Sequence, residues 1–368
     1  MNSCEEILNG IEYKSEFLEE ILGENRNYKN FFDNLPEAIL IVQENKIVQA
    51  NELMCRLLGV DSNKVINASI FNYSKGKYKG ILKRKIADVI KYKKKCDSFE
   101  YECIVPSGKE MFLQAIIGYT DYDKKPAVFI LLSDNTEIKK ELNRAALFQR
   151  NSLQTEFDFG ENINIERIYI PAKIISGDFY RICSRDDKHI IGTLIDVRGK
   201  GISAALSISA INILFLQEIS NNVHPSKIVE NLNKALVKYY DETYIAVCVF
   251  EIDLEKKTLN AVGAGINKFF HITEGEEIKE RIIRGPFLGM FEDSEFEEIT
   301  INLKSDDKII LFTDGFEFIL ENEKSISESL KHDNPKKIIK KIERSIENEI
   351  LENGNLKDDC TVLVINIR

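Results

Sequence analysis

The chain has 368 residues, of which 43% are hydrophobic and 30% are charged, and its formal net charge is −10. This length exceeds one ordinary core, so we expect two or three domains in a globular protein. The acidic balance argues against a general nucleic-acid-binding protein. The 7 cysteines are scattered and form no CxxC pair, which is typical of buried thiols in a reducing compartment rather than of a disulfide framework or a zinc site.

Two further features favour a cytoplasmic protein. The longest apolar stretch begins at Ile202, is interrupted by serines and Asn212, and is too short and too polar to span a bilayer comfortably. The N-terminus, MNSCEEILNG, is acidic and lacks a secretory pattern. We therefore expect neither a membrane nor a nucleic acid as a partner.

Residues 1–28 carry apolar side chains at helical spacing. Steps of four and three residues lead from Cys4 to Leu22 and form a heptad-like seam. Two interpretations are open, a short dimerising coiled coil and an amphipathic helix packed on the next domain. Together with the helical segment before the second large domain, this seam favours a homodimer.

Residues 29–137 are expected to form one small α+β domain. The run LPEAILIVQENKIVQAN predicts a strand, a turn at EN and a second strand, and a short helix from Glu52 to Leu58 is expected to end at Gly59. Three more strand-like runs, FEYECIV, EMFLQAIIGY and PAVFILLSD, follow the lysine-rich segment KRKIADVIKYKKK. We interpret the lysine run as a solvated helix face, with contact to an anionic partner as the alternative.

Residues 138–157 contain no Gly or Pro and are rich in helix-forming residues. They predict a linker helix, which either transmits a signal between the flanking domains or only spaces them.

Residues 158–368 are dominated by strand-like runs. Three longer helical stretches are expected at Ile202–Asn221, Pro225–Tyr240 and Pro335–Glu352. Many strands with a few helices predict an α+β sandwich.

Four aspartates of this last domain lie at the ends of apolar runs. Asp178 enters a strand in SGDFY, and Asp196 ends the run HIIGTLID. Asp314 follows IILFT, and Asp358 precedes the strand CTVLVINI. Each motif alone is ordinary, because Asp-Gly usually marks a turn. The four together predict carboxylates that meet at one rim of the sandwich.

Carboxylates gathered at one rim repel one another unless a cation neutralises them. Oxygen ligands without paired His or Cys favour Mg²⁺ or Mn²⁺ over zinc. Two such ions roughly 3.5–4 Å apart would activate a water for in-line attack on a phosphate.

Three pieces of the first domain, NLPEAILIVQENKIVQANELMCRLLGV, PSGKEMF and SDNTEIKKE, resemble a PAS sensor domain. The resemblance implies ligand sensing or dimerisation, with a small molecule as a possible ligand. The segment contains no histidine, which argues against a histidine-ligated haem inside it.

The second large domain resembles the metal-dependent PPM serine/threonine phosphatases, in the branch of stage II sporulation protein E and the stress-response sigma-factor phosphatases. The matching pieces, in order, are FQRNSLQ, IYIPAKIISGDFY, LIDVRGKGISAAL, VGAGINKFF, GPFLGMF, IILFTDGFE and LKDDCTVLVI. The resemblance implies an αββα sandwich that binds two Mn²⁺ or Mg²⁺ ions.

The resemblance also implies roles for particular residues. Asp196 would bridge both ions, and Val197 would offer its backbone carbonyl. Asp314 and Asp358 would complete the shell of one ion, and Asp178 would act directly or through a water.

Three other residues are weaker candidates. Asp359 is a lesser metal candidate, and the backbone of Gly177 lies near the site. Arg198 stands where the eukaryotic branch has a histidine, so it either contacts the substrate phosphate or is a surface residue.

Other positions depart from the family pattern. They are Arg181 after GDFY, Ile266 and Lys268 in AGINK, and Glu317 one position before the usual glutamate.

The resemblance implies a metal-dependent protein serine/threonine phosphatase whose substrate is an anti-sigma-factor antagonist or a similar regulatory phosphoprotein. We expect the PAS domain to regulate it through the linker and the helix from Ile202; a constitutive enzyme with a PAS used only for dimerisation is the alternative. Two other functions are open, a diguanylate-cyclase-like enzyme, because SGDFY superficially resembles GGDEF, and a catalytically inactive partner-binding module.

Overall fold

The computed structural model describes residues 28–368, apart from 77, 155–156, 200, 222, 241–243, 274–276 and 323. The chain divides into two compact units, Met1–Glu141 and Leu142–Arg368. The helix expected in residues 1–28 lies outside the described residues, except for its last position.

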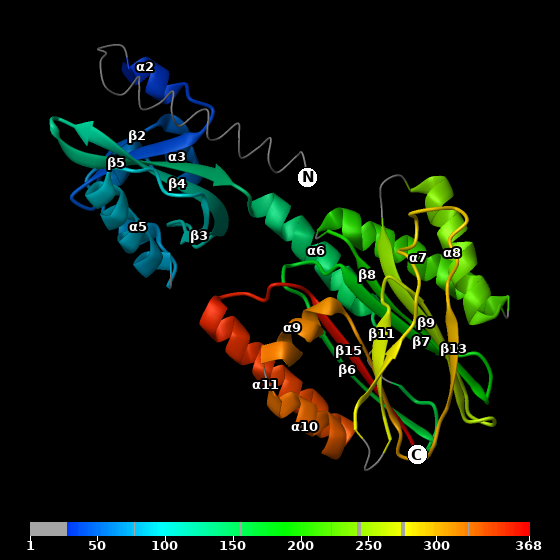
Figure 1. Ribbon diagram of the computed structural model, residues 1–368. Coiled ribbons are helices and arrows are strands. Elements are labelled where there is room, and N and C mark those ends of the chain that lie inside the picture. The colour runs from blue at the N-terminus through cyan, green and yellow to red at the C-terminus, as the bar shows by residue number, and fades with distance from the viewer. Residues whose placement is uncertain are drawn as a thin grey trace. The chain divides into compact units, whose positions relative to one another are not determined.

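Unit 1 is built on a five-stranded antiparallel sheet with the strand order β2-β1-β5-β4-β3 (Figure 1). Its strands are β1 (Ala38–Gln43), β2 (Lys46–Ala50), β3 (Phe99–Ile104), β4 (Glu110–Tyr122) and β5 (Lys125–Asp134). Its helices are α2 (Tyr28–Asp33), α3 (Glu52–Leu58), α4 (Ser62–Val65), the 3₁₀ helix η1 (Ile70–Tyr73) and α5 (Tyr78–Tyr92). The expected strand pair and short helix are confirmed.

Local sequence explains the start of this unit. The turn between β1 and β2 places Glu44 and Asn45 at φ 51° and 64°, the left-handed pair that a two-residue hairpin needs. Asn51 caps α3 by accepting the N–H of Met54 at 2.9 Å, and Gly59 ends it at φ 67°.

Strand β1 is covered on both faces. Ala38, Leu40 and Val42 join the core beneath α3–α5, while Ile39 and Ile41 join Phe32 of α2 on the opposite face. The period-two alternation therefore distributes one apolar run between two cores.

Helix α6 (Thr136–Ser152) leaves unit 1 and enters unit 2. At its start, the N–H of Thr136 donates to Asp134 Oδ1 at 2.9 Å. At its end, the Ser152 hydroxyl donates to the carbonyl of Phe148 at 2.9 Å, so one of the last free carbonyls is satisfied within the helix. A helix thus stands where the linker helix was predicted, and it ends at Ser152, before the predicted limit.

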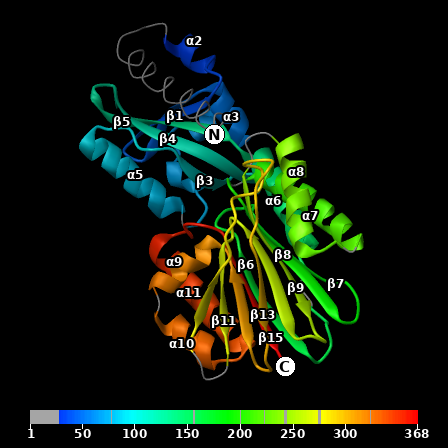
Figure 2. The same ribbon diagram turned by 45° about the vertical axis from the view of Figure 1, so that its right-hand side comes forward.

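Unit 2 is a sandwich of two five-stranded antiparallel sheets, ordered β13-β10-β9-β8-β7 and β12-β11-β14-β15-β6 (Figure 2). Helices α7 (Ile202–Ser220) and α8 (Pro225–Tyr239) cover the first sheet, and α9 (Asp314–Asn322), α10 (Lys324–His332) and α11 (Pro335–Asn353) cover the second. The strands are β6 (Ile163–Ile170), β7 (Asp178–Ser184), β8 (His189–Val197), β9 (Ile245–Asp253), β10 (Thr258–Ala264), β11 (Lys268–Ile272), β12 (Lys279–Ile282), β13 (Glu298–Asn302), β14 (Lys308–Phe312) and β15 (Cys360–Ile367).

This αββα arrangement confirms the predicted sandwich. Strand β9 is buried at every position, because one face meets the other sheet and the other face meets the helices. The sequence did not indicate β12, α9 or α10. Strand β12 reads KERI and is mostly exposed, so it lacks apolar alternation, and α9 starts within the turn-like DGFE.

Within the described part of the chain, α7 is long and apolar enough to cross a membrane by length and composition alone. Its inner residues Ala204, Ile208, Ile211 and Phe215 are buried against the sheet. A packed helix of a sandwich passes the same compositional test, so this is weak evidence for a span.

Candidate active site

Strands β7 and β8 place two of the predicted carboxylates opposite each other. Asp178 pairs with Asp196 in the antiparallel register, so both side chains lie on one face at neighbouring positions. The N–H of Val197 donates to the carbonyl of Gly177 at 2.9 Å, which closes this end of the strand pair.

Asp178 is also joined to the second sheet. It is 2% exposed, and its Oδ2 accepts the hydroxyls of Thr313 and Thr361, each at 2.7 Å. Thr313 lies between β14 and α9, and Thr361 belongs to β15. One buried carboxylate thus brings together the strand ends that carry Asp314 and the aspartate pair before β15.

The electrostatics of this carboxylate are unfavourable without a cation. Burial, followed by the nearby charge of Asp196, raises the pKa of Asp178 well above its usual range. The two threonine hydroxyls act in the opposite direction.

Asp359 has a different environment from its neighbour Asp358. Asp359 is 3% exposed, and its two oxygens accept the N–H groups of Ala172 and Gly177, both at 2.6 Å. Asp358 is half-buried. The Asp359 carboxylate therefore anchors the 172–177 loop to the start of β15.

Glycines allow these segments to approach closely. A Cβ on Gly315 would lie 2.1 Å from the carbonyl oxygen of Asp359, and one on Gly177 would lie 2.7 Å from that of Val197. No larger residue fits at either position without movement of the backbone.

The remaining candidates lie nearer the surface. Asp196 is half-buried, whereas Asp314 and Arg198 are exposed. Among the residues that the structure describes, no three acidic, histidine or cysteine side chains already form a group that could hold an ion. The fold thus brings the predicted segments together, and the buried Asp178 beside Asp196 is the feature that a divalent cation would neutralise.

The linker helix contacts the loop that precedes Asp178. Gln149 of α6 is 6% exposed; its amide donates to the carbonyl of Ser176 at 2.9 Å, and its Oε1 accepts the N–H of Ser176 at 3.1 Å. The Ser176 hydroxyl then accepts the N–H of Asp178 at 3.0 Å.

Arg181, a departure from the family pattern, joins two helices. Its Nη2 donates to the carbonyl of Ser152 at 2.9 Å, and its Nε donates to Asn212 Oδ1 of α7 at 3.2 Å. Two other departures pair with each other, because Lys268 Nζ lies 2.9 Å from Glu317 Oε2.

Sequence reasoning missed Gln149, Thr313, Thr361 and Asn212. The two threonines were visible as the residue before Asp314 and the polar residue near the start of β15. Gln149 lies in the matching piece FQRNSLQ and Asn212 interrupts an apolar run, but neither pattern indicated their contacts, because the partners are distant in the sequence.

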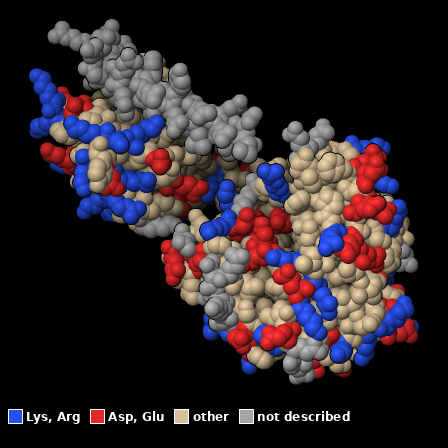
Figure 3. All heavy atoms as spheres, in the orientation of Figure 1, with Lys and Arg blue, Asp and Glu red and all other residues tan. Residues whose placement is uncertain are grey.

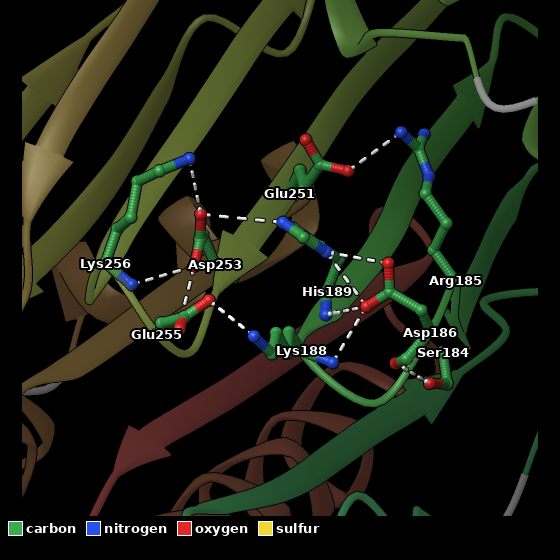
Figure 4. Close-up of polar contacts among 9 residues, drawn as sticks. All are labelled: Ser184, Arg185, Asp186, Lys188, His189, Glu251, Asp253, Glu255 and Lys256. Atoms are coloured by element: carbon green, nitrogen blue, oxygen red, sulfur yellow. Dashed lines mark hydrogen bonds and ion pairs between the residues drawn. The ribbon is translucent and has the colours of Figure 1, made fainter.

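A second polar cluster lies at the other end of β8 (Figure 4). His189 Nδ1 is 2.8 Å from Asp186 Oδ1, and its Nε2 is 3.5 Å from Asp253 Oδ2. His189 and Asp196 are separated by seven steps along the strand, or about 23 Å. The cluster therefore ties the β7–β8 turn to β9 and takes no part in the candidate active site.

The fold and the site define a PAS-type unit followed by a PP2C-type sandwich. Residues 36–137 match the PAS domain model, and residues 186–368 match the model of stage II sporulation protein E (SpoIIE). The chain accordingly carries a PAS domain followed by a domain of the SpoIIE family, which confirms the resemblance seen in the sequence.

Curated relatives include two proteins of Bacillus subtilis. Phosphoserine phosphatase RsbU is 30% identical over 181 residues, which cover 49% of this chain and 54% of RsbU. Phosphoserine phosphatase RsbP is 30% identical over 182 residues, which cover 48% of this chain and 45% of RsbP. The chain thus spans about half the length of these relatives.

Among solved structures, the SiaA-PP2C domain of Pseudomonas aeruginosa aligns with a TM-score of 0.53 at 20% identity, covering 63% of this chain and 98% of that domain. This likeness shows the fold. The SGDFY turn enters β7 of this sandwich, so the diguanylate-cyclase interpretation is wrong.

Proposed function

We propose that this chain is a divalent-metal-dependent phosphoprotein phosphatase acting on phosphoserine or phosphothreonine. The observation that carries the proposal is the convergence of β7, β8, β14 and β15 around Asp178, in a domain of the SpoIIE family. The phosphoserine phosphatase names of the aligned relatives support it.

The proposed ligands of two Mn²⁺ or Mg²⁺ ions are the carboxylates of Asp196, Asp314 and Asp358 and the carbonyl of Val197, with Asp178 acting directly or through a water. When bound, the ions neutralise phosphate oxygens and lower the pKa of water. The chain's own contribution is that the hydroxyls of Thr313 and Thr361 orient Asp178 and favour its ionised form, against the larger opposing effect of burial and of Asp196.

Arg198 follows this ligand set in the loop after β8. It is exposed, and we assign it to the substrate phosphate, which a guanidinium binds through charge-assisted hydrogen bonds. No histidine stands two residues after Asp196, so water protonates the leaving group.

The proposed substrate is a phosphorylated regulatory protein of the anti-sigma-factor-antagonist kind, and the proposed location is the cytoplasm. The match to the SpoIIE family model and the phosphoserine phosphatase names of the relatives support a phosphorylated substrate. A catalytically inactive PPM-fold module is the alternative.

Regulation by the PAS domain would pass through α6. Gln149 holds the backbone of Ser176 beside Asp178, and Arg181 joins the end of α6 to α7. Rotation or unwinding of α6 would therefore strain the loop before Asp178. A constitutive enzyme with a PAS used only for dimerisation is the alternative.

The proposed signal is a small molecule bound by the PAS domain. A cavity of about 720 Å³ in unit 1 is lined in part by Asp33, Gln49 and Cys55, within the size range of ligand pockets. Gln49 Oε1 is buried and has no hydrogen-bond partner in the described part of the chain, so it would accept a hydrogen bond from a ligand.

A homodimer is the proposed assembly. On α7, Ile202, Leu206 and Ile213 are 53%, 66% and 65% exposed, and on α6, Leu147 and Phe148 are 59% and 70% exposed. Exposed apolar side chains on two helices of one unit suit contact with a second copy.

The activity is tested with p-nitrophenyl phosphate and excess Mn²⁺. We expect turnover in the wild type and a loss of at least about 100-fold in Asp196→Asn, because one charged ligand of both ions is removed. Wild-type protein without metal-dependent turnover, or an Asp196→Asn variant as active as the wild type, would contradict the proposal.

Regulation is tested in the full chain with Gln149→Leu, which removes both hydrogen bonds to Ser176 at similar volume. We expect kcat to change while binding of Mn²⁺ is kept. Gln43→Leu in unit 1 is the control, because it also removes two hydrogen bonds, those to the carbonyls of Tyr122 and Lys125, and neither partner belongs to α6. Equal kcat in all three proteins would support a constitutive enzyme.

A further inference from the structure

We propose that the exposed face of α5 docks unit 1 onto an anionic lipid surface. Six exposed basic side chains form this docking face, hereafter the basic face: Lys79, Lys83, Arg84 and Lys91 on α5, and Lys93 and Lys94 directly after its last residue. Figure 3 shows basic side chains gathered over the part of unit 1 where α5 lies. In a chain of net charge −10, this concentration is unusual.

The basic face is not neutralised by ion pairs in the part of the chain that the structure describes. None of its six residues forms an ion pair with any residue that the structure describes. Even Arg84 and Asp88, at i and i+4, do not pair, whereas Arg56 and Glu52 at the same spacing lie 3.3 Å apart. The like charges therefore repel one another, and this local cost is offset when an anionic surface covers them.

Apolar side chains stand among these cations. Ile90 is 37% exposed and Tyr92 is 59% exposed, and Lys91 Nζ lies 4.8 Å from the Tyr92 ring centroid. Lysine stems beside an exposed aromatic ring match the boundary between lipid headgroups and acyl chains.

The inner face of α5 stays in the PAS core. Leu82, Ile86 and Val89 are 2–3% exposed, so contact with lipid requires no unfolding of the helix. Docking would use the outer face as it stands.

The chemistry of the basic face favours lipid over nucleic acid. Five of its six members are lysines, which act as compact point charges, whereas bidentate phosphate recognition favours arginine. The exposed Ile90 and Tyr92 offer apolar contact that a nucleic-acid backbone does not reward. The proposal departs from the expectation, drawn from net charge and composition, that no membrane is a partner.

The acidic remainder of the chain does not cancel this attraction. Charges more than about 10 Å from the surface are screened at about 0.1 M salt. A basic residue close to an anionic membrane strengthens binding roughly fivefold, or about 1 kcal/mol.

The test is sedimentation of the full chain with vesicles of phosphatidylcholine containing about 30% phosphatidylglycerol. Lys83→Gln/Lys91→Gln/Lys94→Gln removes three charges of the basic face. Lys336→Gln/Lys337→Gln/Lys340→Gln removes three exposed charges of α11 in unit 2 and is the matched control. Circular dichroism and p-nitrophenyl phosphate turnover check that each variant is folded.

We expect the wild type and the control to bind anionic vesicles and not pure phosphatidylcholine, and the basic-face variant to bind on the order of 100-fold more weakly. Binding should fall as salt rises, and Tyr92→Ser should weaken it further at constant charge.

Three outcomes would overturn the proposal. The first is a wild type that does not bind anionic vesicles. The second is an equal loss of vesicle binding in both triple variants, and the third is tighter binding of duplex DNA than of vesicles. Turnover on p-nitrophenyl phosphate is independent of these outcomes, so failure here leaves the proposed phosphatase activity untouched.

Discussion

Asp359 gives the sharpest test of how the candidate site is held together. Its two oxygens accept the N–H groups of Ala172 and Gly177, each at 2.6 Å, in a side chain that is 3% exposed. A hydrogen bond to a charged group contributes about 1.5–3 kcal/mol. Asp359→Ala removes two such hydrogen bonds and leaves both buried N–H groups without an acceptor. We therefore expect the unfolding free energy of unit 2 to fall by about 3–6 kcal/mol.

Asp359→Asn keeps one acceptor and turns an NH₂ group toward the other donor, so we expect about half of that loss. Asp358→Ala is the matched control. Asp358 is half-buried, and its Oδ1 accepts the N–H of Asp359 at 2.8 Å. We expect less than about 1 kcal/mol of lost stability there, together with loss of Mn²⁺-dependent turnover.

The assay is urea unfolding followed by a probe in unit 2, because two units need not unfold in one transition, alongside Mn²⁺ titration of turnover. If Asp359→Ala unfolds like the wild type while its Mn²⁺ affinity falls, Asp359 is a metal ligand and the anchoring role is wrong. If Asp358→Ala is the less stable variant, the two neighbours have been assigned in reverse.

Further changes test other parts of the fold. Gly315→Ala places a Cβ 2.1 Å from the Asp359 carbonyl oxygen, so we expect it to lower the unfolding free energy by about 1–3 kcal/mol and to weaken the Mn²⁺ response. Gly80→Ala in α5 is the control, because its Cβ would meet nothing within 4 Å, and it should stabilise unit 1 by up to about 1 kcal/mol. Unchanged stability in Gly315→Ala would refute the close approach. Hydrogen bonds from the main chain of Lys256, more than its side chain, lower the pKa of Asp253 from 3.8 to about 2, so its contribution to stability is complete above the unfolded pKa and is lost as the pH falls through the folded one. Acid unfolding should therefore show the advantage of the wild type over Asp253→Asn shrinking from about pH 4 to about pH 2; an advantage independent of pH would contradict the assignment.

Local patterns accounted for most of the elements. Strand β8 and strand β7 occupy the predicted residues, and α3 ends at Gly59 as expected, because apolar alternation and caps act over a few residues. The elements missed were those whose local pattern is polar or turn-like, such as β12 and the start of α9. Their conformation depends on neighbours supplied by the sandwich.

The candidate site likewise combines features visible in the sequence with features that depend on the fold. The aspartates at strand ends were visible in the sequence, because a carboxylate after an apolar run is costly without a partner. The different roles of Asp358 and Asp359 were decided by which backbone donors come within 2.6 Å, and those donors lie 187 and 182 positions away in the chain.

The sequence by itself determined the two domain types, the strand ends that carry aspartates and the lysine-rich helix, because each depends on a pattern of residues that are close together in the chain. Tertiary structure alone decided that Thr313 and Thr361 donate to one carboxylate, that Gln149 holds the loop before it, and that the basic face forms no ion pair with the residues that the structure describes. Those contacts join segments that are remote in the sequence, so they form only when the chain has folded and these segments have packed together.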